Sequence, residues 1–362
     1  MGRWPYRRVR YPRDAVGEKQ PLRGAVPFSI CSPAIGYARR WGELRVAHSP
    51  VPAPASTPLT SRIVWRFIDG RAGHDNQSRG LVSALDRITP IQVHDISVPA
   101  RVNRALNWIR GRSSLTHQLP APDLIIGAGH DTHLPMLTAR RQHGGRTVAL
   151  MRPTLPHHWF NRCIVPEHDG IEETERVLVT RGVLNAVQPQ TEPNPQSGLI
   201  LLGGPSPHFH WNEDHLLEQI RELVGRSKDR GWTITTSRRT PESTYRKLTS
   251  LTEQEISLVP HQSVDVSWLP SQLATAGEIW VTEDSVSMIY EALTAGGATG
   301  IFDLEPLRQG RLQRGLEKLV TANMVTRFSD WQAGTQPLSA KPPLREADRC
   351  ARWIRDHWLS AA

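Results

Sequence analysis

The sequence has few cysteines and no long apolar run. Its three cysteines, Cys31, Cys163 and Cys350, are odd in number and far apart, which argues against both a disulfide scaffold and a zinc site. No segment approaches the roughly 18 consecutive apolar residues of a membrane-spanning helix, and no charged-then-apolar signal peptide opens the chain. We therefore expect a cytoplasmic protein for which any association with the inner membrane is peripheral.

Most of the chain also lacks a surplus of charge. The formal net charge is +9, but residues 1–40 carry +7 of it and the rest only +2. Because the remainder is nearly neutral, we expect no nucleic-acid partner. Residues 1–60 contain nine of the 29 prolines and no periodic apolar pattern, which predicts a disordered basic extension. A transit peptide is less favoured because the segment is poor in serine.

From Ile63 onwards, short apolar runs alternate with segments of helical periodicity, which is typical of an α/β fold with parallel strands. Residues 185–197 are rich in proline and have no apolar period, so they are predicted to be a linker, and the alternation begins again at Leu199. We predict two Rossmann-like, doubly wound domains that face a cleft. The expected boundaries are a 1–60 extension, a 61–184 first domain, a 185–197 linker, a 198–335 second domain and a 336–362 tail and helix.

Two glycine-bearing loops follow predicted strands of the first domain. Glycine lets the backbone approach a ligand, and polar side chains crowd around both loops. Neither loop has a Walker or G-x-G-x-x-G pattern, and a histidine or aspartate in such a loop can equally stabilise the turn by a hydrogen bond. The candidates here are Asp69, Gly70, Gly73, His74, Asn76, Gln77, Gly127, Gly129 and His130.

Four histidines of this region, at positions 130, 133, 157 and 158, could suggest a metal site. His130 and His133 straddle a turn, however, and no cysteine or carboxylate cluster accompanies them. We therefore expect no bound metal.

Three polar loops follow strands of the second domain, and a doubly wound sheet brings such loops to one edge. Arg238 and Arg239 suit a diphosphate, Ser285 is a candidate helix N-cap whose helix could bind phosphate through first-turn amides, and Glu291 could accept hydrogen bonds from a ribose. The alternatives are a solvated arginine pair, an ordinary cap and a solvated helix residue. The full set is Gly203, Gly204, Ser206, Ser237, Arg238, Arg239, Thr282, Asp284, Ser285, Ser287, Met288 and Glu291.

The chain ends in a predicted helix over residues 345–359. Its apolar face comprises Ala347, Cys350, Ile354 and Trp358, with Trp353 beside it. We expect this helix to pack back onto one of the two domains.

Six segments, taken in order over residues 63–305, resemble the mitochondrial fission "elongated mitochondria" family. They are DGRAGHDNQSRGL at 69–81, PDLIIGAG at 122–129, VPEHD at 165–169, LLGGPS at 201–206, SRRTP at 237–241 and VTEDSVSMIYEA at 281–292. The resemblance implies a GT-B-like fold, similar to that of nucleotide-sugar glycosyltransferases. The plant member is associated with recruiting a dynamin-related protein. This sequence departs from the family at residues 182–185, where GVLN replaces the expected Gly-Ala-Leu-His.

Together these features predict a metal-independent glycosyltransferase with a nucleotide-diphosphate sugar donor and an envelope or lipid-linked acceptor at a membrane surface. The second domain would hold the donor. His74 is the preferred base, with Asp69 and His130 as reserves. No cofactor is expected. The alternatives are a non-catalytic scaffold that binds a protein or membrane partner, and a nucleotide-sugar epimerase or hydrolase.

Overall fold

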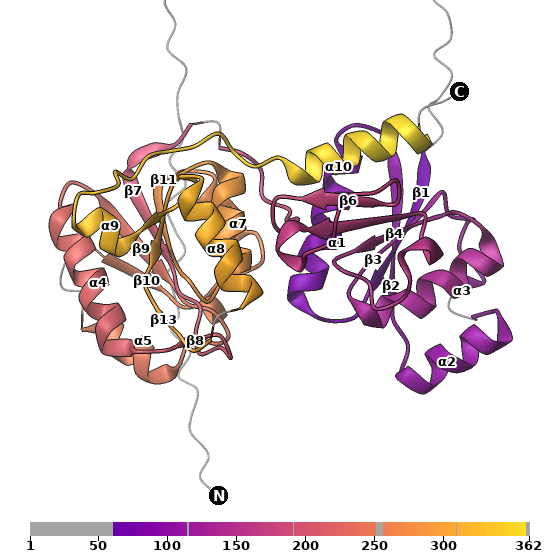
Figure 1. Ribbon diagram of the computed structural model, residues 1–362, viewed down its shortest axis with the longest axis horizontal. Coiled ribbons are helices and arrows are strands. Elements are labelled where there is room, and N and C mark those ends of the chain that lie inside the picture. The colour runs from indigo at the N-terminus through magenta and orange to yellow at the C-terminus, as the bar shows by residue number, and fades with distance from the viewer. Residues whose placement is uncertain (1–60, 114–115, 191, 251–255, 309, 360–362) are drawn as a thin grey trace, which may run out of the picture. The chain divides into compact units, whose positions relative to one another are not determined.

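The computed structural model describes residues 61–113, 116–190, 192–250, 256–308 and 310–359 (Figure 1). The predicted extension at residues 1–60 lies outside them. Pro58–Ala362 form one compact unit. None of the helices described is both long and apolar enough to cross a membrane.

The first domain is built on a six-stranded parallel sheet with the order β2-β1-β3-β4-β5-β6. Its helices connect the strands, as the alternation of apolar runs predicted. Strand β6 was not foreseen, because only four residues form it, after a polar stretch. The elements are β1 (Arg62–Ile68), α1 (Ala72–Asp86), β2 (Ile91–Ser97), α2 (Arg101–Arg110), β3 (Leu124–Ala128), α3 (His133–His143), β4 (Arg146–Leu150), β5 (Arg162–Pro166) and β6 (Val177–Thr180).

The second domain has its own six-stranded parallel sheet, in the order β10-β9-β7-β11-β12-β14. In chain order this is the 3-2-1-4-5-6 arrangement of Rossmann folds, with the reversal between β7 and β11. The strands are β7 (Asn194–Leu201), β9 (Gly231–Thr235), β10 (Ile256–Val259), β11 (Ala276–Thr282), β12 (Ala298–Phe302) and β14 (Thr326–Arg327). The helices are α4 (Glu213–Arg226), α5 (Glu242–Thr249), α6 (Trp268–Leu273), α7 (Val286–Ala295), α8 (Arg311–Thr321) and α9 (Phe328–Gln332), and β8 (Phe209–His210) pairs with β13 (Glu305–Pro306). The predicted α/β, GT-B-like pair of Rossmann-like domains is confirmed.

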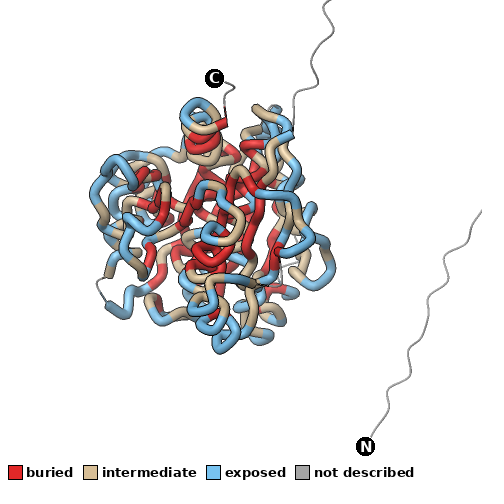
Figure 2. The backbone as a smooth tube through the Cα atoms, turned by 90° about the vertical axis from the view of Figure 1, so that its right-hand side faces the viewer, coloured by how far each residue is buried: buried red, intermediate tan, exposed pale blue. Residues whose placement is uncertain are grey.

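Both faces of each sheet are covered, so the central strands are apolar without alternation. Figure 2 shows buried segments in the interior of the molecule and exposed segments around them. Trp65, Trp232 and Trp280 have exposed fractions of 0%, 1% and 0%. Each buried leucine or isoleucine of these cores stabilises the fold by roughly 1.5–3 kcal/mol.

One charge interrupts the first core, as the sequence of β1 indicated. Arg66 is buried, and its Nε donates to Asp95 Oδ1 at 2.7 Å while its Nη1 donates to Asp75 Oδ1 at 2.6 Å. Burial alone would lower the pKa of Arg66, but the two carboxylates outweigh it and raise the pKa. The ion pairs fasten β1 to β2 and to the first turn of α1.

The last helix, α10 (Glu346–Ile354), continues as a wider turn over Arg355–Leu359 and packs on α1 (Figure 1). Cys350, Ile354 and Leu359 are buried in the same core as Leu81. The guanidinium of Arg162 lies 3.8 Å from the centre of the Trp353 ring, a cation–π contact. The expectation that this helix returns to one of the domains is confirmed, and the domain is the first.

Candidate functional site

The carboxylate of Asp69, which follows β1, and the imidazole of His74, in the first turn of α1, form a pair. His74 Nδ1 lies 2.7 Å from Asp69 Oδ2, and the side chains are 17% and 1% exposed. Because the carboxylate can only accept, it holds the ring proton on Nδ1 and leaves Nε2 to take a proton from elsewhere. Two of the three candidate bases are therefore brought together as one unit.

The second glycine loop of this domain lies directly against the pair. Gly129 has φ +82°, and a Cβ there would stand 2.3 Å from Cε1 of His74. Only glycine fits this close approach in this backbone conformation. Asp69 follows β1 and Gly129 follows β3, the two strands between which the chain order reverses, so both loops meet at the switch point of the first sheet.

The third candidate base, His130, has a different environment. Its side chain is 45% exposed and its Nε2 lies 3.3 Å from Asp131 Oδ1. Arg104 Nη1 donates to the same Asp131 oxygen at 2.5 Å. Burial would raise the pKa of Asp131, but the hydrogen bond and charge of Arg104 outweigh it and lower the pKa. Asp131 is thus bonded to Arg104 and does not orient His130 alone. The Asp69–His74 pair is therefore the better-positioned candidate base.

The first glycine loop is shorter than predicted. Helix α1 begins at Ala72, so Gly73, Asn76 and Gln77 lie on the helix, not in a loop, and Gln77 is buried. Of the candidates there, Gly70 remains in the turn, with φ +81°. The helix begins early because the Arg71 carbonyl accepts from the amides of His74 and Asp75, at 3.0 and 2.9 Å.

The three polar loops of the second domain meet at the switch point between β7 and β11. The amide of Gly203 donates to Thr282 Oγ1 at 2.8 Å, and that of Gly204 to Asp284 Oδ2 at 3.0 Å. Ser237 Oγ donates to the Gly203 carbonyl at 2.7 Å. The predicted convergence of these loops is present, and they bind to one another.

Asp284 is the centre of this cluster. Its side chain is 0% exposed and forms an ion pair with Arg239, Oδ2 to Nη2, at 2.7 Å. Burial raises the pKa of Asp284, against the hydrogen bond from Thr282 and the charge of Arg239. A Cβ on Gly203 would lie 2.2 Å from the Asp284 carboxylate. Gly203 therefore leaves room for the Asp284 side chain.

The two predicted arginines have different surroundings. Arg239 is held by Asp284 and by the Gly204 carbonyl, to which its Nη1 donates at 3.0 Å. Arg238 is exposed, and its side chain forms no hydrogen bond or ion pair with the other residues that the structure describes. A diphosphate could therefore reach Arg238 without breaking an existing ion pair.

The remaining donor-side candidates surround the start of α7. Ser285 occupies the N-cap position, but its side chain makes no capping hydrogen bond, so the predicted cap is wrong in that detail. The side chain of Ser287 is exposed on the first turn, and Met288 is partly buried against the core. Ser206 Oγ accepts from the amides of His208 and Phe209, at 3.3 and 3.2 Å, within its own loop.

Glu291 is linked to the first domain. Asn76 Nδ2, on α1, donates to Glu291 Oε1, on α7, at 2.6 Å. Burial raises the pKa of Glu291 to about 7, opposed only by the hydrogen bond from Asn76. Because Asn76 is two residues from His74, this bond brings the helix of the candidate base against the helix of the candidate donor site.

The family model for mitochondrial fission ELM1 matches residues 72–358. The chain belongs to this family. Among curated proteins, the chain is 24% identical over 347 residues to the uncharacterised protein RP120 of Rickettsia prowazekii (strain Madrid E), covering 81% of this chain and 97% of that one.

Among solved structures, the chain is similar to one from Listeria monocytogenes that is assigned as a UDP-N-acetylglucosamine 2-epimerase. The TM-score is 0.55 at 12% identity, covering 83% of this chain and 98% of that chain. At this identity the similarity shows a shared fold, which agrees with the two-domain architecture above.

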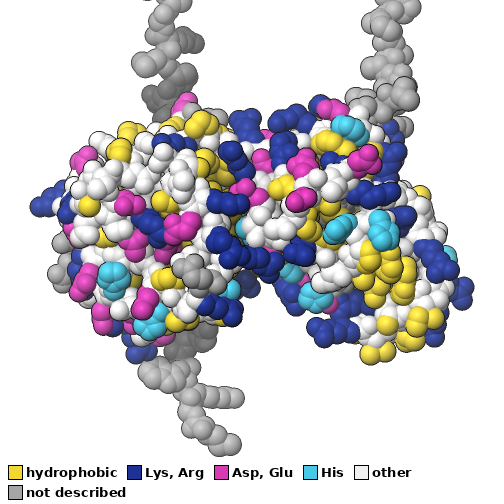
Figure 3. Space-filling model, viewed as in Figure 1, with side chains coloured by type: hydrophobic (Ala, Val, Ile, Leu, Met, Phe, Trp, Pro, Cys, Tyr) yellow, Lys and Arg dark blue, Asp and Glu magenta, His cyan; other side chains and the backbone are white. Residues whose placement is uncertain are grey.

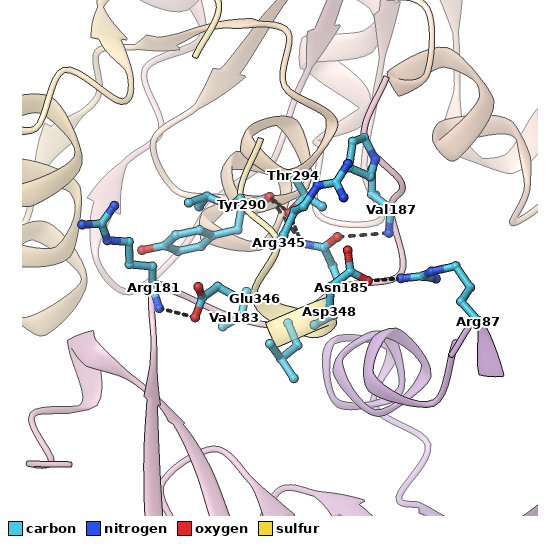
Figure 4. Close-up of a pocket in the computed structure, with 14 residues that line it drawn as sticks. Arg87, Arg181, Val183, Asn185, Val187, Tyr290, Thr294, Arg345, Glu346 and Asp348 are labelled. Carbon is cyan, nitrogen blue, oxygen red and sulfur yellow. Dashed lines mark hydrogen bonds and ion pairs between the residues drawn. The ribbon is translucent and has the colours of Figure 1, made fainter. Parts of the chain in front are cut away.

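A pocket that the sequence did not indicate lies where the chain crosses between the two domains (Figure 4). Asn185 Nδ2 donates to Thr294 Oγ1 at 2.9 Å and to the Tyr290 carbonyl at 3.3 Å. On the other side Arg87 pairs with Asp348, and the Arg181 amide donates to Glu346 at 3.1 Å. Asn185 is the position at which the family resemblance led us to expect histidine. That difference was the only feature of the sequence that pointed to this place.

The predicted linker is partly structured. Strand β7 already begins at Asn194, and the Gln190 amide donates to the Ala295 carbonyl at 2.8 Å. Among the residues that the structure describes, no three His, Cys, Asp or Glu side chains are grouped so as to hold a metal ion.

Proposed function

We propose that this protein is a glycosyltransferase that uses a nucleotide-diphosphate sugar, needs no metal ion and acts on an envelope or lipid-linked acceptor. The bond of 2.6 Å between Asn76 and Glu291 carries the proposal. It joins the helix of the Asp69–His74 pair to the helix whose first turn borders the donor loops. A base on one domain and a donor site on the other are the two parts that such a transfer needs.

On the donor side, the first-turn amides of α7 lack carbonyl partners within the helix, and the helix dipole favours an anion at this end. Together with Arg238 they would stabilise the diphosphate as it leaves. Glu291 would accept hydrogen bonds from the ribose hydroxyls. Asn76 then serves to orient the Glu291 carboxylate.

On the acceptor side, His74 Nε2 would take the proton of the acceptor hydroxyl as its oxygen bonds to the anomeric carbon. The bond from that carbon to the diphosphate breaks, and its electron pair leaves with the diphosphate. Asp69, at 2.7 Å from Nδ1, stabilises the imidazolium that results. No step requires a metal ion, so we expect transfer to continue in the presence of a chelator.

The test is calorimetry of the purified protein with UDP, GDP, ADP and dTDP and with their sugars. We expect binding of one diphosphate class. Glu291→Ala should weaken it at least about tenfold, because two charge-assisted hydrogen bonds are lost. The control is Glu218→Ala, an exposed residue of α4 in the same domain, which should bind as the wild type does.

Asn76→Ala separates ligand contact from domain contact. If Glu291 binds the ribose, Asn76→Ala should weaken nucleotide binding less than Glu291→Ala does. Equal losses in both variants would mean that the bond between the domains matters and that Glu291 does not contact the ligand. A well-folded protein that binds none of these nucleotides would contradict the proposal and favour a scaffold. Conversion of the sugar without any acceptor would favour the epimerase or hydrolase.

A further inference from the structure

Helix α2 exposes an apolar stripe. Val102, Leu106 and Ile109 are 71%, 39% and 77% exposed, and their spacing of four and then three residues places them on one face. The opposite face is anchored, because Arg104 is buried and bonded to Asp131, and Trp108 stacks on Trp159 with ring centres 6.1 Å apart. The exposed stripe is therefore held outward by the packing of the rest of the helix.

Basic side chains flank the stripe on both sides. Arg101 and Arg110 are exposed and lie on either side of it in the helical projection. Past the end of the helix, Arg141 lies against Gly111, where an added Cβ would be 3.0 Å from its guanidinium. Residues 96–122 contain four arginines and no Asp or Glu. Figure 3 shows hydrophobic side chains over α2 and α3 with Lys and Arg beside them.

We propose that this face, the α2 stripe with its flanking arginines, binds the surface of an anionic lipid membrane. An apolar stripe bordered by arginines matches such a surface in both respects, since the apolar groups enter the headgroup boundary and the guanidinium groups pair with lipid phosphates. Trp159, which is 37% exposed beside Trp108, adds an aromatic side chain of the kind found at this boundary.

The position of α2 connects this surface to the candidate site. Arg104 of α2 donates to both the carbonyl and the carboxylate of Asp131, at 2.9 and 2.5 Å. Asp131 follows the glycine loop that packs against His74. A membrane bound at α2 would thus lie at the edge of the sheet that bears the candidate base. Membrane binding by this face does not depend on the proposed transfer reaction.

The test is co-sedimentation of the full-length protein with vesicles of phosphatidylcholine alone and with vesicles that also contain phosphatidylglycerol. We expect binding to the anionic vesicles. Val102→Ser combined with Ile109→Ser should weaken it about tenfold or more, and Arg101→Gln combined with Arg110→Gln about fivefold per arginine. Both variants keep residues 1–60, so any basic contribution of that segment is the same throughout.

Matched controls come from the second domain. Val266 and Leu307 are 84% and 57% exposed, and Val266→Ser with Leu307→Ser should bind vesicles as the wild type does. Arg221 and Arg314 of the same domain are exposed and serve as the charge control. Melting temperatures and nucleotide binding should be unchanged in the α2 variants, which separates this proposal from the proposed function.

Three outcomes would overturn the proposal. The wild type could fail to bind anionic vesicles at low salt. The α2 variants could bind as tightly as their controls, which would place the binding surface elsewhere on the chain. The stripe could instead be a dimer contact, shown by a wild-type dimer that the Val102→Ser and Ile109→Ser variant dissociates without any vesicle binding.

Discussion

At the scale of single residues, the candidate site holds two carboxylates in contrasting environments. The Asp69 side chain is 1% exposed and lies against a side chain that can carry a positive charge, His74, whereas the half-buried Glu291 lies against a neutral amide, Asn76. A neutral donor offsets little of the cost of burying a charge. Glu291 therefore keeps a raised pKa of about 7, so its charge changes near neutral pH.

We predict that Glu291→Gln changes the pH dependence of stability. The folded-state pKa of Glu291, about 7, is above the ordinary 4.5. Its contribution to stability is therefore full below pH 4.5, decreases as the pH rises from 4.5 to 7, and is lost above pH 7. Glutamine has no charge to bury. The free energy of unfolding of the variant, relative to wild type, should therefore be higher at pH 8 than at pH 5 by about 2 kcal/mol, as measured by denaturant unfolding. Glu218→Gln should show no such difference, and a pH-independent effect of Glu291→Gln would place the carboxylate in water.

A second prediction at this scale concerns His74. His74→Ala should lower the rate of sugar transfer about 10²–10⁴-fold, because a positioned base contributes that much, while nucleotide affinity stays unchanged. Steady-state kinetics with separate nucleotide calorimetry measures both. His215 is exposed on α4, and His215→Ala should retain wild-type transfer. Full activity of His74→Ala would remove the Asp69–His74 pair from the mechanism.

At the scale of elements, the sequence predicted which loops would meet but not which side chains would occupy the space between them. Apolar runs marked the strands, and the carboxyl ends of parallel strands share an edge, so convergence could be inferred. The Asp284–Arg239 ion pair could not, because it depends on side-chain packing across 45 residues of sequence. The early start of α1 was missed because Gly73 and Asn76 are weak helix formers, and local bonding to the Arg71 carbonyl overrides their preference.

This packing predicts opposite effects for two glycine substitutions. Gly203→Ala places a Cβ 2.2 Å from the Asp284 carboxylate, so it should destabilise the protein by about 1–3 kcal/mol through overpacking. Gly225 lies within α4 with nothing within 4 Å of an added Cβ, so Gly225→Ala should stabilise it by about 0.5–1 kcal/mol. Chemical denaturation of both variants gives the comparison. Equal stability of Gly203→Ala and wild type would show that Asp284 can leave the loop readily.

At the scale of the whole molecule, the C-terminal helix α10 contributes side chains to the hydrophobic core of the first domain. After the second sheet, the amide of Leu344 donates to the Leu293 carbonyl of α7, in the second domain, at 3.0 Å, and the chain then returns to the first domain, where α10 covers α1. The sequence predicted a packing helix from the spacing of Cys350 and Ile354. It could not choose the domain, because either sheet offers an apolar face.

The last prediction compares the two ends of the chain. Deleting residues 1–60 should leave the melting temperature and nucleotide binding unchanged, because that segment has no periodic apolar pattern to contribute to a core. Deleting residues 336–362 should destabilise the protein by more than about 4 kcal/mol, because it removes several side chains that are each worth roughly 1.5–3 kcal/mol when buried. Thermal and chemical unfolding of both truncated proteins test this.

Point variants keep this comparison informative if the second truncation fails to fold. Ile354 is 0% exposed, so Ile354→Ala should cost about 2–5 kcal/mol, whereas Arg352→Ala on the exposed side of the same helix should change stability by no more than about 0.5 kcal/mol. Because Ile354 belongs to the core that contains Leu81 and Cys350, the loss should appear in the first domain. Hydrogen exchange should therefore rise in β1 and β3 before it rises in β7 and β11. Uniform exchange in both sheets would mean that the two domains unfold as a single cooperative unit.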